Sequence, residues 1–139
     1  LAGRLEIVND SPLVVLDGAH NLPGMQALTT TLQNDFKEME IYVLVAILAD
    51  KQYQLMLGEI ASLPNVHLML TNFAGPGPKR PSADLKKVAK DIKTHWPIET
   101  APSWQEGLLR LSREVSADDA ILITGSLYFI SEVRRFFAD

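Results

Sequence analysis

The sequence has 139 residues, enough for one domain with a buried core, and we expect no second domain within it. Its net charge of −4 lacks the basic footprint of a nucleic-acid-binding protein, so we expect no nucleic-acid partner. The absence of cysteine excludes a disulfide framework, a thiolate nucleophile and a sulfur-ligated metal, and the three histidines lie far apart in sequence. We therefore assign no metal ligands to this chain.

The sequence also carries no membrane signal. No apolar run reaches the length of about 20 residues that crosses a bilayer, and the first residues lack the profile of a signal peptide. We expect a cytoplasmic protein with no membrane partner. Because the sequence does not begin with methionine, we also expect it to be part of a longer polypeptide.

Two short strands are predicted at the start of the chain. Residues 5–8 and 13–16 are strand candidates, and the turn-forming sequence Asn9-Asp10-Ser11-Pro12 separates them, so they are predicted to form an antiparallel hairpin at a sheet edge. The second run is continuously apolar, which is typical of a strand buried on both faces. A helix is then predicted from Asn21 to about Glu38, because apolar residues recur at helical spacing at Met25, Leu28, Leu32 and Phe36.

The remaining sequence alternates between apolar runs and amphipathic stretches. Further strands are predicted over residues 41–48, 66–71, 97–100 and 120–124. Further helices are predicted over residues 51–63, 82–92, 103–115 and 127–137. This alternation predicts an α/β fold: a Rossmann-like, doubly wound, mostly parallel sheet of about six strands with helices on both faces.

Polar residues follow three of the predicted strands. They are residues 17–21, Asp50-Lys51 and Gly125-Ser126. Because ligands bind at the carboxyl ends of parallel strands, and helix N-termini favour anions, these segments are predicted to form one anion-binding crevice. The sequence contains neither G-x-x-x-x-G-K-[ST] nor G-x-G-x-x-G, so it has no phosphate cradle of its own.

Each of these residues also has a structural interpretation. Asp17 fits a turn, and Asn21 is best explained as the N-cap of the following helix. His20 alone leaves both a structural hydrogen bond and a role in the site open. Lys79-Arg80 falls in a loop predicted for residues 72–81, where a solvated tip and contact with an anionic ligand both remain open.

These motifs resemble the carboxy-terminal domain of folylpolyglutamate synthases and bifunctional dihydrofolate synthases, within the Mur ligase superfamily. The matching segments occur in family order from end to end: Gly3-Arg4-Leu5-Glu6, Pro12 to Asn21 as P-L-V-V-L-D-G-A-H-N, Asp50-Lys51, and Ile123 to Tyr128. Two details depart from the family pattern. The proline expected directly after D-G-A-H-N is displaced to position 23, and the P-R-S/A segment appears only within residues 78–82, which leaves the role of Arg80 open. The resemblance implies that residues 1–139 are a Mur-ligase-type carboxy-terminal domain.

The resemblance implies an ATP-dependent ligase that adds glutamate to folates through an acyl phosphate. The P-loop, the Mg²⁺ ligands and most of the folate pocket would lie in a larger amino-terminal domain of the same polypeptide, so this chain would be inactive alone. Carried over by motif, Arg4 would contact the ATP phosphates and stabilise the charge that passes to the acyl phosphate. Asp17 would accept hydrogen bonds from the ribose hydroxyls. His20 would sit between phosphate and glutamate, and Lys51 and Ser126 would hold the carboxylates of glutamate.

Two other classes of function stay open from the sequence. The chain could be a free-standing small-molecule-binding or signalling module with a doubly wound fold, in which the strand-end aspartates bind a ligand or accept a phosphoryl group. It could also be an interaction domain that covers the surface of a partner. The sequence leaves open its oligomeric state, and whether dihydropteroate is a substrate besides folate.

Overall fold

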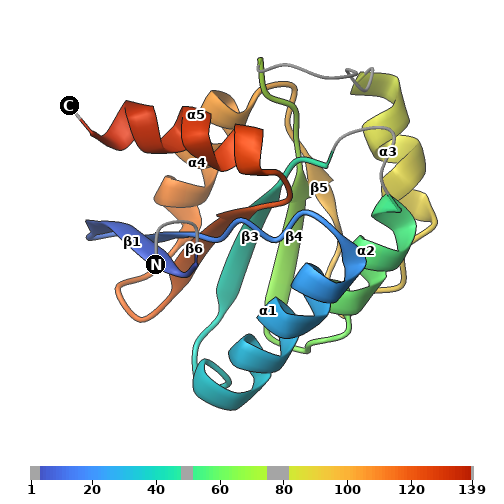
Figure 1. Cartoon of the computed structure of the whole chain (residues 1–139), viewed down its shortest axis with the longest axis horizontal. Coiled ribbons are helices and arrows are strands. Elements are labelled where there is room, and N and C mark those ends of the chain that lie inside the picture. Colours follow the sequence, from blue (N-terminus) through green and yellow to red (C-terminus); the bar gives the residue numbers. More distant parts are fainter. Residues whose placement is uncertain (1–3, 48–51, 75–81, 139) are drawn as a thin grey trace.

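The structure, a computed structural model, describes residues 4–47, 52–74 and 82–138 (Figure 1). These residues form six strands and five helices. The strands are β1 (Glu6–Asp10), β2 (Leu13–Leu16), β3 (Ile41–Val45), β4 (Val66–Leu70), β5 (Glu99–Thr100) and β6 (Ala120–Thr124). The helices are α1 (Leu22–Asp35), α2 (Tyr53–Ala61), α3 (Ser82–Lys90), α4 (Trp104–Glu114) and α5 (Leu127–Phe137).

The six strands join one sheet in the order β1-β2-β6-β3-β4-β5. β1 pairs with β2 antiparallel, and every other neighbouring pair is parallel. β6 is the last strand in sequence, yet it lies between β2 and β3. The arrangement confirms the predicted fold class, including the antiparallel hairpin at one edge of the sheet.

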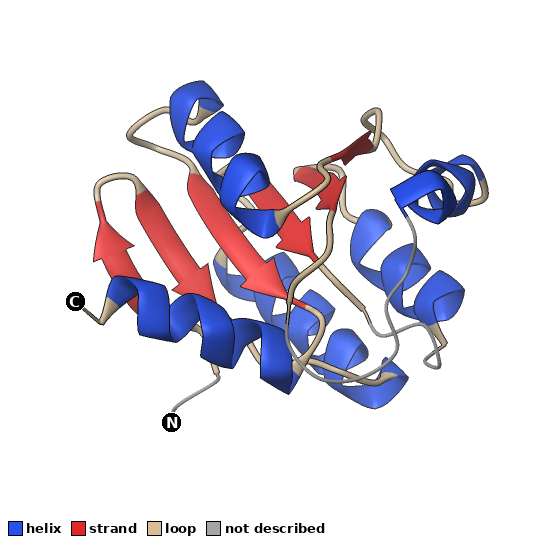
Figure 2. Ribbon diagram, turned by 90° about the horizontal axis from the view of Figure 1, so that it is seen from above, coloured by secondary structure: helices blue, strands red, loops and turns tan. Residues whose placement is uncertain are grey.

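Helices cover both faces of the sheet (Figure 2). On one face, α1, α2 and α3 pack over a core that includes Val15, Val43 and Leu122. On the other face, α4 and α5 pack over a core that includes Leu16 and Ile123. The crossovers through α1, α2 and α3 run outward along the first face, and α4 returns along the opposite face to reach β6, so the sheet is doubly wound.

β2 leads from the sheet interior to the predicted site. Val14 is 2% exposed and Val15 is 8% exposed, which confirms that both faces of this strand are buried. The ladder with β6 continues one residue past the strand, because the Asp17 N–H donates to the Ile123 carbonyl at 3.0 Å. The carboxyl end of β2 is therefore fixed beside the carboxyl end of β6.

Most element boundaries differ from the prediction by one to three residues, and two of these differences have a clear cause. β1 continues to Asp10, because Asp10 pairs with Leu13 across the hairpin and so leaves a shorter turn than the sequence indicated. α1 ends at Asp35 rather than near Glu38, because the backbone of Phe36 leaves the helical conformation. Within the described ranges, no helix is both long and apolar enough to cross a lipid bilayer.

Candidate functional site

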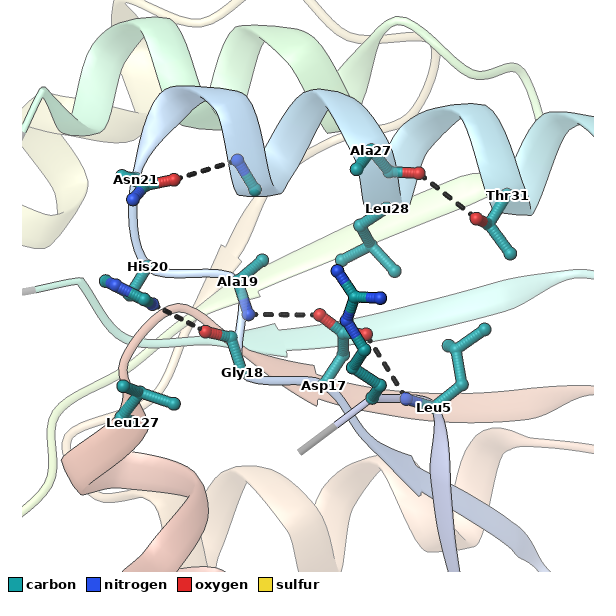
Figure 3. Close-up of a pocket in the computed structure, with 12 residues that line it drawn as sticks. Leu5, Asp17, Gly18, Ala19, His20, Asn21, Ala27, Leu28, Thr31 and Leu127 are labelled. Atoms are coloured by element: carbon teal, nitrogen blue, oxygen red, sulfur yellow. Dashed lines mark hydrogen bonds between the residues drawn. The ribbon is translucent and has the colours of Figure 1, made fainter. Parts of the chain in front are cut away.

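A pocket of about 470 Å³ lies at the carboxyl end of β2 (Figure 3). Arg4 and Leu5 line it from the segment before β1, residues 17–21 line it from the β2–α1 loop, and Leu127 lines it from the start of α5. The chain leaves β2 for α1 on one face of the sheet and leaves the neighbouring β6 for α5 on the other. The pocket is therefore at a topological switch point, the position where open α/β sheets bind ligands.

Asp17 lies at the centre of this pocket. Its Oδ1 accepts a hydrogen bond from the Ala19 N–H at 3.0 Å, and its Oδ2 accepts one from the Leu5 N–H at 3.2 Å. Burial raises the pKa of Asp17 above its ordinary value of 3.8, although these two N–H bonds and the positive charge of Arg4 act in the opposite direction. Each carboxylate oxygen still has acceptor capacity for a ligand hydroxyl.

His20 and Asn21 connect this loop to α1. The Nδ1 of His20 lies 2.9 Å from the Gly18 carbonyl oxygen, which only accepts, so Nδ1 carries the proton and Nε2 is the acceptor of the neutral ring. The Oδ1 of Asn21 accepts the Gly24 N–H at 2.8 Å, which confirms Asn21 as the N-cap of α1. The positive end of the α1 dipole is thus close to the pocket.

Arg4 lies at the pocket wall with an exposed side chain. Its positive charge acts to lower the pKa of Asp17, against the larger effect of burial. The pocket thus holds a cation and a carboxylate. The structure therefore brings together three of the five predicted site residues: Arg4, Asp17 and His20.

Ser126 lies beside the pocket but is only 3% exposed. Its Oγ accepts the N–H groups of Tyr128 and Phe129 at 3.2 and 3.4 Å, so it serves as the N-cap of α5. Before it, the Gly125 N–H donates to the Ala19 carbonyl at 3.2 Å, and this bond holds the β2–α1 loop on the end of β6.

The other predicted site segments cannot be placed. Asp50-Lys51 and Arg80 lie outside the described residues, so the expected roles of Lys51 and Arg80 stay predictions.

One side of α1 also lines the pocket, although nothing in the sequence predicted it. Ala27, Leu28 and Thr31 lie along this side, as Figure 3 shows. Together with Gly24 they recur at intervals of three and four residues, which is the spacing of one helix face. That spacing was present in the sequence, but only the position of α1 over the carboxyl end of β2 shows that this face meets a ligand pocket.

The side chains of the pocket can also be assessed as metal ligands. Among the residues that the structure describes, no group of three or more His, Cys, Asp or Glu side chains is arranged to hold a metal ion. The pocket itself combines one carboxylate, one guanidinium and one imidazole. That donor set suits an anionic, hydroxyl-bearing ligand better than a bare divalent cation.

The fold is a doubly wound α/β domain with a pocket at its topological switch point. The family described as "Mur ligase, glutamate ligase domain" matches residues 3–127. The chain belongs to this family.

Two curated relatives match nearly the whole chain. The chain is 35% identical to a dihydrofolate synthase/folylpolyglutamate synthase of Bacillus subtilis over 96% of its own length. It is 38% identical to a folylpolyglutamate synthase of Lacticaseibacillus casei over 95% of its length. It spans only 30% and 28% of these two relatives.

The same fold occurs in a solved structure. A Mycobacterium tuberculosis folylpolyglutamate synthase complexed with ADP and AMPPCP superposes with a TM-score of 0.80 at 27% identity. The match covers 99% of this chain and 32% of that one.

Proposed function

We propose that this chain is the carboxy-terminal domain of an ATP-dependent ligase that adds glutamate to folates, a folylpolyglutamate synthase. The observation that carries the proposal is the common pocket of Arg4, Asp17 and His20, which belong to the motifs G-R-L-E and D-G-A-H-N. Family membership and the names of the relatives support it. Whether dihydropteroate is also a substrate depends on contacts beyond this pocket.

The pocket fits a nucleoside triphosphate in charge and hydrogen bonding. Asp17 would accept the ribose hydroxyls, because its two oxygens are held in place by backbone N–H groups and retain free lone pairs. Arg4 would contact the phosphates, where a guanidinium stabilises redistributing negative charge. Bound ATP would supply the phosphoryl group that activates the folate carboxylate as an acyl phosphate, ready for attack by the amine of glutamate.

The glutamate contacts form the second part of the proposal. His20 would lie between phosphate and incoming glutamate, with its ring orientation set by the Gly18 carbonyl. Lys51 and Ser126 would hold the carboxylates of glutamate. For Ser126 the role is restricted, because its oxygen already accepts two backbone N–H groups and only its hydroxyl proton remains to donate.

The remaining parts of the site would come from elsewhere in the longer polypeptide. The sequence has no phosphate-binding loop, and the described residues provide no cluster of metal ligands. We therefore propose that an amino-terminal P-loop domain holds most of the folate and the Mg²⁺ that accompanies ATP. The cytoplasmic location expected from the sequence is part of the same proposal.

The test uses the complete polypeptide encoded by the gene that contains this sequence. It is incubated with ATP, Mg²⁺, tetrahydrofolate and labelled glutamate, and both glutamate incorporation and ADP release are measured. We expect the two products in equal amounts, and a clear fall in the rate of formation of both in Arg4→Ala. Glu99→Gln, which changes an arginine-paired carboxylate on β5, is the matched control and should retain activity.

The outcome also separates the alternatives. Nucleotide binding without folate-dependent incorporation of glutamate would contradict the ligase and favour a small-molecule-binding module. Normal incorporation in Arg4→Ala would show that the pocket described here is not the nucleotide site.

A further inference from the structure

Leu5 has a backbone conformation that leucine rarely adopts. Its φ is +44°, and no other non-glycine residue among those described has a positive φ. A side chain with a Cβ is crowded in this region, so the conformation persists only where surrounding contacts hold it. Leu5 separates Arg4 from β1, and its φ therefore sets the direction in which Arg4 leaves the sheet edge.

One of these contacts comes from the pocket itself. The Leu5 N–H donates to Asp17 Oδ2, as Figure 3 shows, and the Leu5 side chain packs against the core under α1. Asp17 thus contacts the backbone next to Arg4, and it also interacts with the charge of the Arg4 side chain.

The second contact lies on the opposite face of the sheet. Glu6 receives hydrogen bonds from the Arg134 side chain of α5: Nη2 to Oε1 at 2.9 Å, Nε to Oε1 at 3.1 Å and Nε to Oε2 at 3.2 Å. The side chains are 28% and 34% exposed, so water screens the pair only in part. We call this pair the Glu6–Arg134 clamp. It fixes the first residue of β1 to a helix that is remote in sequence.

We propose that Glu6 and Arg134 are positioning residues that hold Arg4 at the nucleotide pocket. The inference rests on the proposed function, because the purpose of the clamp is the placement of Arg4. Glu6 is fixed from one face and the Leu5 N–H from the other, so the strained turn at Leu5 lies between two fixed points. Without the clamp, the end of the edge strand frays, Leu5 relaxes to negative φ, and Arg4 turns away from the pocket.

The geometry of the pair explains why an arginine occupies position 134. A guanidinium fork fixes direction as well as distance, whereas a lysine supplies only a point charge. A partly exposed ion pair adds little to global stability. The main effect of the clamp is therefore expected on the position of Arg4 and less on the stability of the domain.

The test uses the complete polypeptide and four single variants. Glu6→Gln and Arg134→Met break the clamp, and Arg134→Lys keeps the charge but not the fork. Glu99→Gln is the matched control, because the ion pair of Glu99 with Arg110 also joins a strand to a helix and Arg110 is about as exposed as Arg134. Two quantities are measured: hydrogen exchange of the peptide that contains the Leu5 amide, and kcat with the KM values for ATP and glutamate.

We expect faster exchange at the Leu5 amide in the three clamp variants and unchanged exchange in Glu99→Gln. We also expect kcat to fall by about tenfold or more, because a small misplacement of a charged group has large kinetic effects. In an Arg4→Ala background, the clamp variants should cause no further loss of kcat, since the residue that they position is absent.

Two results would overturn the proposal. Unchanged exchange at Leu5 in the clamp variants would show that the clamp does not hold this turn. Equal loss of kcat with and without Arg4 would show that the clamp acts through stability alone. If Arg4→Ala itself keeps full activity, the proposed function of the pocket fails, and the exchange measurement still decides whether the clamp holds Leu5.

Discussion

Asp17 is the residue at which the contacts of the pocket meet. It accepts hydrogen bonds from the loop that follows it and from the segment before β1, and it lies close to the charge of Arg4. The fold opposes the ionisation of Asp17, because burial outweighs these favourable contacts and raises its pKa. The fold therefore disfavours the ionised form of Asp17 relative to the unfolded chain.

This effect has a definite dependence on pH. Between the ordinary value of 3.8 and the raised pKa of Asp17, the folded chain holds the proton more tightly than the unfolded chain, so the contribution of Asp17 to stability falls as pH rises through that window. Urea unfolding of wild type and Asp17→Asn should therefore show a stability difference that moves against wild type as pH rises. A difference that moves in favour of wild type would mean that the N–H bonds and Arg4 outweigh burial.

The kinetic roles of the pocket residues should separate in the complete polypeptide, if it is the proposed ligase. Arg4→Ala should chiefly lower kcat, because its charge matters most when negative charge redistributes in the transition state. Asp17→Ala should chiefly raise the KM for ATP, because a ribose contact is similar in ground and transition states. Each loss should be about 1–3 kcal/mol, the scale of an unmade charged hydrogen bond. His20→Ala should instead impair the use of glutamate. Steady-state kinetics with each substrate varied in turn measures these effects. A raised KM for ATP in Arg4→Ala with kcat unchanged would contradict the assigned roles.

At the scale of elements, the sequence predicted features that have a local pattern, and it did not predict contacts between distant segments. The apolar run of β2 and the N-cap at Asn21 are local signals, and both are confirmed. The strained Leu5 and the pairing of Glu6 with Arg134 have no local signal, because they depend on which helix lies against the edge strand. The resemblance of motifs therefore predicted a role for Arg4 in the site, but it gave no indication of what holds Arg4 in place.

Ser126 illustrates the same limit. A serine at the start of a helix fits both a ligand contact and an N-cap, and only the structure shows that its oxygen is engaged by α5. The order of the strands was equally hidden, since nothing in the sequence near β6 indicates that it enters the sheet between β2 and β3.

The turn between β6 and α5 provides a stability prediction. Gly125 has a φ of +119°, and a Cβ built on it would lie 2.3 Å from the Ala46 carbonyl oxygen. Gly125→Ala should therefore destabilise the domain by more than about 2 kcal/mol. The matched control is Gly58→Ala in α2, where no atom lies within 4 Å of the added Cβ. That change should stabilise by about 0.5–1 kcal/mol, because alanine is the better helix former. Thermal or urea unfolding measures both, and similar values for the two variants would contradict the assigned turn.

At the scale of the whole molecule, the domain contains a complete core but only one side of the proposed reaction site. Both faces of the sheet are covered by helices of the same chain. The pocket opens at the carboxyl edge with a cation, a carboxylate and an imidazole, but the chain has no phosphate-binding loop. The domain should therefore fold without the rest of the polypeptide, whereas catalysis should require it.

This difference leads to a prediction for the 139-residue chain on its own. It should unfold in a single cooperative transition, because its two cores share the strands of one sheet. The purified chain should show no ATP hydrolysis and no addition of glutamate to folate, because Arg4 and Asp17 would provide only one wall of the proposed nucleotide site and the sequence has no loop that cradles the phosphates. Circular dichroism during urea titration tests the first statement, and ADP release with labelled glutamate tests the second. Turnover that persists after purification, and disappears in Arg4→Ala of the same short chain, would show that this domain is a complete catalyst and that the composite site is wrong.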